Sequence, residues 1–315
     1  MEIINNWRSS HNLPLLFFRL ALAQKAKRVD PQYLIAQRIK RLPAIRLKLV
    51  RLPRLKLSQV QDIGGCRAVV QNIQRIKQLV GLYEQSRARH VHDHKSDYLE
   101  NPKSDGYRGV HLIYRYCSEQ YQTHNGLKVE IQIRSKLQHA WATAVETVGI
   151  FTGEALKSSQ GSEDWRRFFA LMGTAIAMRE KAKIIPNTPA EKKDLVAQLR
   201  AYVSKLDAQT RLDTYSSMLQ MPKHPGLGGS QYFLLELDPL AKKILVTGYK
   251  KTELALASER YLEVERSIAA KSDAPVGAQA VLVSVESLSS LRRAYPNYFL
   301  DMRVFIEEVN RALTF

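Results

Sequence analysis

The sequence of 315 residues is poor in cysteine and in acidic side chains, and it has no long uninterrupted apolar run. Its two cysteines, Cys66 and Cys117, lack metal-ligand spacing, which argues against a disulfide framework and favours a reducing compartment. We expect both to be small, buried apolar residues. The apolar stretch at residues 13–22 is broken by Pro14 and Arg19 and lacks the order of a signal peptide. Because no run approaches the roughly 20 apolar residues that span a membrane, we expect a cytoplasmic protein without a membrane partner.

Acidic residues are too few to balance the basic ones. The chain has 48 lysines and arginines against 30 aspartates and glutamates, a net charge of +18 and a sequence pI of about 9.9. The first 60 residues hold 13 of the basic residues and 2 acidic ones, so +11 of the charge lies there. Such an excess favours phosphate-bearing partners, namely nucleotides, nucleic acid or an anionic surface. A length of 315 residues favours two domains, or one domain with a large extension.

The stretch from 128 to 146, KVEIQIRSKLQHAWATAVE, organises the chain. Apolar residues at 129, 131 and 133 alternate with polar ones, which predicts a strand with one core face and one polar face. The polar members are Lys128, Glu130, Gln132 and Arg134. A solvated polar face is the ordinary explanation of one alternating run. Here apolar residues at helical spacing follow directly, so the polar face would lie beside a packed strand–helix junction, which favours a site.

A basic segment lies near the N-terminus. We expect a helix at 13–28, a short strand at 33–40 in which Arg38 and Lys40 share a face, and a helix that starts at Pro43 and carries Lys48. Each cation alone is best explained as solvated surface. As a set they favour a binding site for phosphates.

The segment from 61 to 70, QDIGGCRAVV, places an aspartate before two glycines and an apolar strand. Asp62 at a strand start is a hard oxygen ligand of the kind that holds Mg²⁺ shared with substrate phosphates. Arg67 lies within the strand. Asp62 could equally be a turn former, so the metal hypothesis needs a second carboxylate.

Turn-forming residues precede the next predicted strand, at 110–114. They place Tyr107 on a loop among Lys103, Arg108 and His111. An aromatic ring among cations is suited to stacking on a purine base whose phosphates the cations hold. A surface turn with a packed tyrosine explains this stretch equally well.

Four ordered motifs, RIKRLPAIRLK, QDIGGCRAVV, NPKSDGYRGVHLIY and VEIQIRSKLQHAWATAVE, resemble the synthetase domain of the RelA/SpoT alarmone synthetases. The resemblance covers about residues 15–150 and is greatest to the small single-domain forms. It implies an α+β fold, a mixed β-sheet flanked by helices and related to nucleotidyltransferases. It also implies ATP-dependent transfer of pyrophosphate to the 3′-hydroxyl of GDP or GTP, which makes guanosine tetraphosphate or pentaphosphate. Two positions depart from the family pattern, Ala44 for a serine and Thr147 for a histidine.

The resemblance also implies roles for single residues. The ATP-binding residues would be Arg38, Lys40, Lys48 and Arg67. The acceptor-binding residues would be Lys103, Tyr107, His111, Gln132 and Arg134. Asp62 and Glu130 would be the catalytic carboxylates and the ligands of a Mg²⁺ cofactor. The dipeptide His92-Asp93 is typical of metal phosphohydrolases but has no further ligands at suitable spacing, so we expect no hydrolase site.

Past residue 150 the resemblance ends. We divide the chain into a RelA/SpoT-like synthetase domain at 1–150, a helical extension at 151–221 and a small α+β domain at 230–315, whose role the sequence leaves open, a regulatory one included. Further expected elements are helices at 71–92, 163–183 and 189–220, a linker at 222–229, a hairpin at 231–250, a helix at 252–270, a strand at 278–285 and helical segments after 287.

Two alternatives stay open. A toxin-type RelA/SpoT enzyme would place pyrophosphate on an adenosine nucleotide or on the 3′ end of tRNA, a partner that the basic N-terminal part of the chain would suit. A non-catalytic basic module would simply bind RNA. The paired carboxylates favour an enzyme, because they would repel a phosphate backbone. The sequence neither requires nor excludes a homo-oligomer.

Overall fold

The computed structural model describes residues 2–86, 89–152, 156, 161–217, 227, 229–238, 243–270, 278–285, 290–291 and 302–315. The strands are β1 (Leu34–Ile39), β2 (Gly64–Val70), β3 (Val91–Asp97), β4 (Val110–Arg115), β5 (Lys128–Ser135), β6 (Tyr232–Asp238), β7 (Lys243–Tyr249) and β8 (Gln279–Ser284). The helices are α1 (Glu2–Ser10), α2 (Asn12–Val29), α3 (Leu42–Arg51), α4 (Ile73–Glu84), α5 (Lys136–Thr152), α6 (Glu163–Arg179), α7 (Lys192–Leu206), α8 (Ala208–Ser217), α9 (Leu254–Ala270) and α11 (Arg303–Ala312).

The strands form one eight-stranded sheet in the order β3-β4-β5-β2-β1-β8-β6-β7. Strands β2 and β5 run parallel, and their neighbours pair antiparallel. This mixed sheet flanked by helices confirms the expected fold class.

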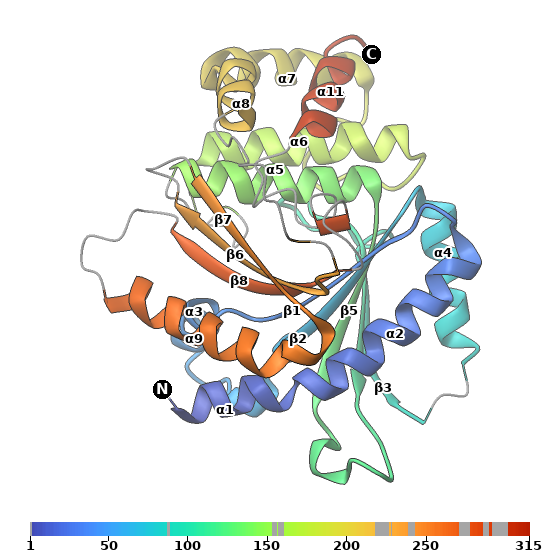
Figure 1. The fold of residues 1–315 in the computed structure, drawn as a ribbon. Helices are drawn as coiled ribbons and strands as arrows, with labels where there is room; N and C mark the ends of the chain where they lie inside the picture. The colour runs from blue at the N-terminus through green and yellow to red at the C-terminus, as the bar shows by residue number, and fades with distance from the viewer. Residues whose placement is uncertain are drawn as a thin grey trace.

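Helices cover both faces of the sheet (Figure 1). On one face α2 and α4 pack against β1, β2, β4 and β5, and α9 packs against β6 and β8. On the other face lies α5, followed by α6, and beyond these α7, α8 and α11. The alternation of β5 explains this arrangement at the centre of the sheet, since its apolar side chains join the core with α2 and its polar side chains lie on the other face. Strands β6 and β8 are apolar on both faces.

Most predicted elements are confirmed, but the helix predicted at 71–92 is too long. It ends at Glu84 as α4, and Val91 begins strand β3. The apolar stripe of α4 stops at Tyr83, which is the last of its buried residues. Strand β3 has the sequence VHDHKSD and lies at the edge of the sheet, so it lacks the apolar alternation by which a strand is recognised.

Two further expectations are wrong. The helix predicted at 189–220 is two helices, because Asp207 adopts a left-handed backbone conformation with φ of 47° between α7 and α8. Aspartate tolerates this conformation and so ends a helix without a glycine or proline signal. Cys117 is exposed, whereas Cys66 is buried as expected.

The three-part division of the chain stays a prediction. The strands of the part at 230–315 belong to the same sheet as those of the first part, since β8 pairs with β1 at Gln37 and Arg38. The predicted linker at 222–229 and the predicted helical segments near Pro296 lie largely outside the described residues. No helix within the described ranges combines the length and apolar character needed to cross a membrane.

Candidate active site

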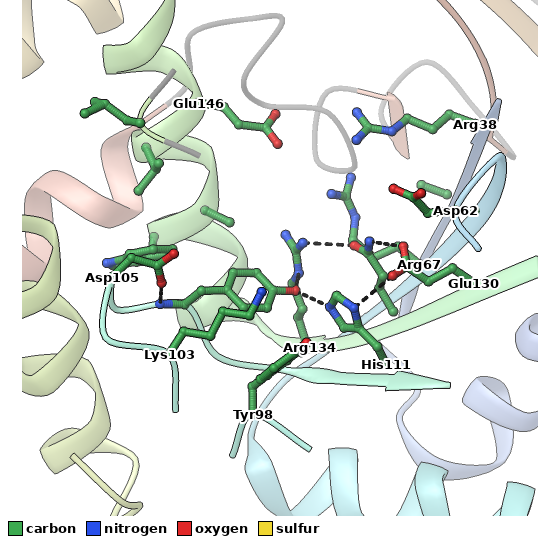
Figure 2. Close-up of a pocket in the computed structure, with 18 of the residues that line it drawn as sticks. Arg38, Asp62, Arg67, Tyr98, Lys103, Asp105, His111, Glu130, Arg134 and Glu146 are labelled. Carbon is green, nitrogen blue, oxygen red and sulfur yellow. Dashed lines mark hydrogen bonds and ion pairs between the residues drawn. The ribbon is translucent and has the colours of Figure 1, made fainter. Parts of the chain in front are cut away.

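A cavity of about 320 Å³ lies over β1, β2, β4 and β5, on the face covered by α5 and α6 (Figure 2). Its walls bring together all but one of the residues nominated from the sequence. These are Arg38, Lys40, Asp62, Arg67, Lys103, Tyr107, His111, Glu130, Gln132 and Arg134. The remaining one, Lys48, reaches Asp62 from α3.

Strand register explains why distant motifs meet here. Gly65 of β2 pairs with Arg38 of β1 on one side and with Glu130 of β5 on the other. Gln132, two residues further along β5, pairs with Arg67 of β2 and with His111 of β4. Because side chains repeat every second residue on one face, these polar side chains all point into the cavity.

Asp62 precedes β2 and binds two lysines. Its Oδ1 accepts a hydrogen bond from Lys48 Nζ at 2.9 Å, and its Oδ2 accepts one from Lys40 Nζ. Burial alone would raise the pKa of Asp62, but the charges of Lys40 and Lys48 outweigh it and hold that pKa well below its usual range. Asp62 is therefore ionised at neutral pH.

Glu130 is held by its neighbours on the same face. His111 Nδ1 lies 2.9 Å from Glu130 Oε1, and the Gln132 amide donates to Oε2 at 2.6 Å. Burial alone would raise the pKa of Glu130, but the hydrogen bond and charge of His111 lower it below its ordinary value. The site thus contains two ionised carboxylates, and the charge of Asp62 acts on Glu130 across it.

A chain of hydrogen bonds connects Glu130 to the tyrosine loop. Arg134 Nε donates to the Tyr107 hydroxyl at 3.2 Å, and that hydroxyl also bonds to His111 Nε2. The two ring nitrogens of His111 thus contact the Tyr107 hydroxyl on one side and the Glu130 carboxylate on the other. Lys103 Nζ lies 5.3 Å from the centre of the Tyr107 ring. Tyr107 is therefore in contact with cations, as the sequence suggests, but its hydroxyl also belongs to a polar network.

The low pKa of Asp62 predicts a pH dependence of stability. A carboxyl group whose pKa is depressed by folding stabilises the native state above its unfolded pKa of about 4, and this contribution is lost as the pH falls below that value. In metal-free buffer, the free energy of unfolding should therefore fall more between about pH 6 and pH 3 in the unchanged protein than in Asp62→Asn. Urea unfolding at both pH values measures these free energies. An equal fall in the unchanged protein and in Asp62→Asn would contradict the lowered pKa of Asp62.

Sequence reasoning missed part of the cavity wall. Trp141 and Glu146 of α5 and Arg166 and Phe169 of α6 contribute to it. Glu146 and Arg38 extend from opposite sides of the cavity (Figure 2). Glu146 ends the last family motif and could have been nominated on that ground. The two residues of α6 lie beyond all four motifs, and only the tertiary packing of α6 brings them to the site.

The arrangement is suited to binding phosphates beside two carboxylates. The cations can neutralise several phosphate charges, and ionised carboxylates are hard oxygen ligands. Within the described residues, no cluster of three or more His, Cys, Asp and Glu side chains could hold a metal ion by itself. Asp62 and Glu130, which line the same cavity, are chemically compatible with Mg²⁺, because this ion is commonly held by one or two carboxylates together with substrate phosphates.

Known proteins are similar in sequence to the part of the chain that forms most of this cavity. Residues 37–149 match the family described as the region found in RelA/SpoT proteins. GTP pyrophosphokinase YjbM of Bacillus subtilis is 30% identical over 116 residues, which are 36% of this chain and 54% of that protein. The uncharacterized protein Rv1366 of Mycobacterium tuberculosis is 31% identical over 140 residues, which are 42% of this chain and 45% of that protein. The chain thus spans about half the length of these curated relatives.

Solved structures show the same fold. Small alarmone synthetase 1 from Bacillus subtilis, bound to its product pppGpp, superposes with a TM-score of 0.50 at 20% identity. The match covers 57% of this chain and 94% of that one. From β1 to α5, residues 37–149 are therefore similar in sequence to the region found in RelA/SpoT proteins, and the chain shares its fold with small alarmone synthetase 1.

Proposed function

We propose that this protein is a Mg²⁺-dependent pyrophosphokinase that transfers pyrophosphate from ATP to the 3′-hydroxyl of GDP or GTP. The observation that carries the proposal is the pairing of Asp62 and Glu130 in one cavity with the cations that surround them. A module that only binds a phosphate backbone has no use for two ionised carboxylates in its binding site. The names of the relatives, GTP pyrophosphokinases among them, support the same reaction class.

The donor half of the site would consist of Arg38, Lys40, Lys48 and Arg67. Such cations would hold the ATP phosphates and orient the β-phosphorus for in-line attack, which needs positioning and charge neutralisation more than covalent chemistry. Mg²⁺ held by Asp62 and Glu130 would neutralise charge on the phosphates. Attack would form a bond from the acceptor 3′-oxygen to the β-phosphorus and break the bond from that phosphorus to the oxygen of the α-phosphate, so that AMP leaves. The O–H bond of the acceptor breaks as well, and its proton passes to water.

Glu130 would orient the acceptor hydroxyl. His111 and Gln132 fix both of its carboxylate oxygens. The lowered pKa of Glu130 makes it a weak base, so its main contribution would be to hold the hydroxyl in line with the phosphorus. Tyr107 and Lys103 would bind the acceptor base and its phosphates.

Substitutions of Tyr107 test whether this residue binds the acceptor nucleotide and not ATP. Tyr107→Ala should weaken binding of GDP by about 1–3 kcal/mol if stacking is the main contact, while binding of an ATP analogue changes little. Tyr107→Phe keeps the ring and should lose much less. Isothermal titration of both nucleotides into each variant measures this, and equal losses for the two nucleotides would make Tyr107 structural.

The acceptor can be identified by competition. The protein is incubated with labelled ATP and Mg²⁺, and GDP, GTP, an adenosine nucleotide and deacylated tRNA compete as acceptors. We expect the label on the guanosine nucleotides, with AMP formed in equal amount. Label on tRNA or on the adenosine nucleotide would replace this acceptor assignment, and no transfer to any acceptor would overturn the enzymatic function.

A further inference from the structure

We infer that two buried ion pairs position the two halves of the cavity independently. Each pair involves a glutamate outside residues 37–149. Glu265 with Arg8 would position the donor half, and Glu180 with Arg108 the acceptor half. This inference rests on the proposed function for the terms donor and acceptor. The glutamates lie in α9 and at the end of α6, which cover opposite faces of the sheet (Figure 1).

The first ion pair is anchored in the interior. Arg8 of α1 is 2% exposed, and its Nη1 lies 2.9 Å from Glu265 Oε2. Its Nη2 donates to the Tyr261 hydroxyl at 2.8 Å, and its Nε donates to the backbone oxygen of Lys40 at 3.0 Å. The pair therefore contacts the residue whose side chain binds Asp62.

Glu265 contacts the same segment through its second oxygen. Its Oε1 accepts hydrogen bonds from the backbone N–H of Leu42 at 3.1 Å and from the Tyr261 hydroxyl at 2.7 Å. Leu42 is the first residue of α3, where N–H groups lack partners within the helix and a negative charge is favourable. The turn from Lys40 to Leu42 is thus held on both sides, by Arg8 at its carbonyl and by Glu265 at its N–H.

The second ion pair acts on the tyrosine loop. Arg108, which follows Tyr107, is 2% exposed, and its Nη1 lies 3.1 Å from Glu180 Oε2. The same oxygen accepts a hydrogen bond from Gln138 Nε2 of α5 at 3.0 Å. Glu180 is the residue that ends α6, so the pair ties this helix to the loop.

Backbone packing brings α6 close to the same loop. A Cβ atom added at Gly106 would lie 2.7 Å from the carbonyl oxygen of Phe169. One added at Gly173 would lie 2.9 Å from Gly106 Cα. These distances leave no space for a side chain, so loop and helix are in direct contact. A shift of α6 would therefore displace Tyr107.

The two pairs share no residue and contact different segments. Neutralising one glutamate leaves its arginine charged in the interior, where an unpaired charge is unfavourable, so the segment that it contacts should shift. Residues that do not touch a ligand can change its binding in this way. Because each shift is local, each pair should affect one nucleotide and not the other.

The test compares Glu265→Gln with Glu180→Gln, both isosteric. The control is Glu263→Gln, which removes an exposed pair with Arg260 on α9. Dissociation constants for a non-hydrolysable ATP analogue and for GDP are measured by calorimetry in the presence of Mg²⁺. Glu265→Gln should weaken the ATP analogue about 2- to 30-fold and leave GDP unchanged, and Glu180→Gln should do the reverse. The control should change neither, because exposed ion pairs contribute little.

Thermal unfolding shows whether Glu265→Gln and Glu180→Gln still fold. If they do not, two milder variants provide the same test. Tyr261→Phe removes only the hydroxyl that bonds to Arg8 and Glu265, and Gln138→Met removes the amide that bonds to Glu180. They should show the same selectivity to a smaller degree. Variants that weaken both nucleotides equally, or neither, would overturn this inference. An unchanged protein that binds neither nucleotide would instead overturn the proposed function on which it rests.

Discussion

Asp62→Asn is expected to lower the rate of pyrophosphate transfer about a hundredfold or more. The substitution preserves the shape of the side chain and removes the charge that would hold Mg²⁺ against the phosphates. It also removes the carboxylate that Lys40 and Lys48 share. Initial rates with saturating ATP and GDP measure the loss, and circular dichroism verifies the fold.

A matched control is available on β3. Asp93 also binds two cations, with its Oδ1 2.5 Å from Arg115 Nη2 and its Oδ2 2.9 Å from Lys128 Nζ. Asp93, Arg115 and Lys128 do not line the cavity. Asp93→Asn should therefore leave the rate almost unchanged. A rate for Asp62→Asn close to that of this control would contradict the catalytic assignment of Asp62.

Gly106→Ala should produce the largest loss of stability, about 3 kcal/mol or more. Gly106 has φ of +99°, which is unfavourable for alanine, and its Cβ would lie 2.8 Å from Cζ2 of Trp141 in addition to the close contact with Phe169. The loop and α6 would have to separate. Urea unfolding measures the loss, and titration with GDP should show weaker binding by whatever folded protein remains.

Gly126 provides the comparison. It also has a positive φ, of +84°, but a Cβ added there would meet nothing within 4 Å. Gly126→Ala should therefore cost only the backbone strain, about 1 kcal/mol. The difference between the two variants measures the cost of the overlap with Phe169 and Trp141. Equal losses would mean that the loop can move away from both neighbours at no cost, which would contradict the close packing against α6.

Local patterns were sufficient to predict much of the site. Alternation in β5 placed Glu130, Gln132 and Arg134 on one face, and the register of β2 and β4 brings Arg67 and His111 beside them. The alternation depends only on neighbours in the chain, so it can be recognised before the fold is known, whereas the pairing of β2 and β4 with β5 is a long-range feature.

Features that depend on tertiary packing could not be predicted. Nothing in the sequence around Arg166 or Phe169 signals that α6 completes the cavity. The buried pair of Arg8 and Glu265 joins residues from opposite ends of the chain, and each alone resembles an ordinary surface charge on a helix. The three strands after residue 230 were predicted, but their pairing with β1 requires a long-range register that no local pattern encodes.

The most direct test of the account is a crystal structure of the protein with Mg²⁺, a non-hydrolysable ATP analogue and GDP. We predict that the ATP phosphates lie among Arg38, Lys40 and Arg67, that the metal lies between them and the carboxylates of Asp62 and Glu130, and that the guanine ring stacks on Tyr107. Nucleotides bound outside this cavity, with Asp62 still paired to both of its lysines, would contradict the account.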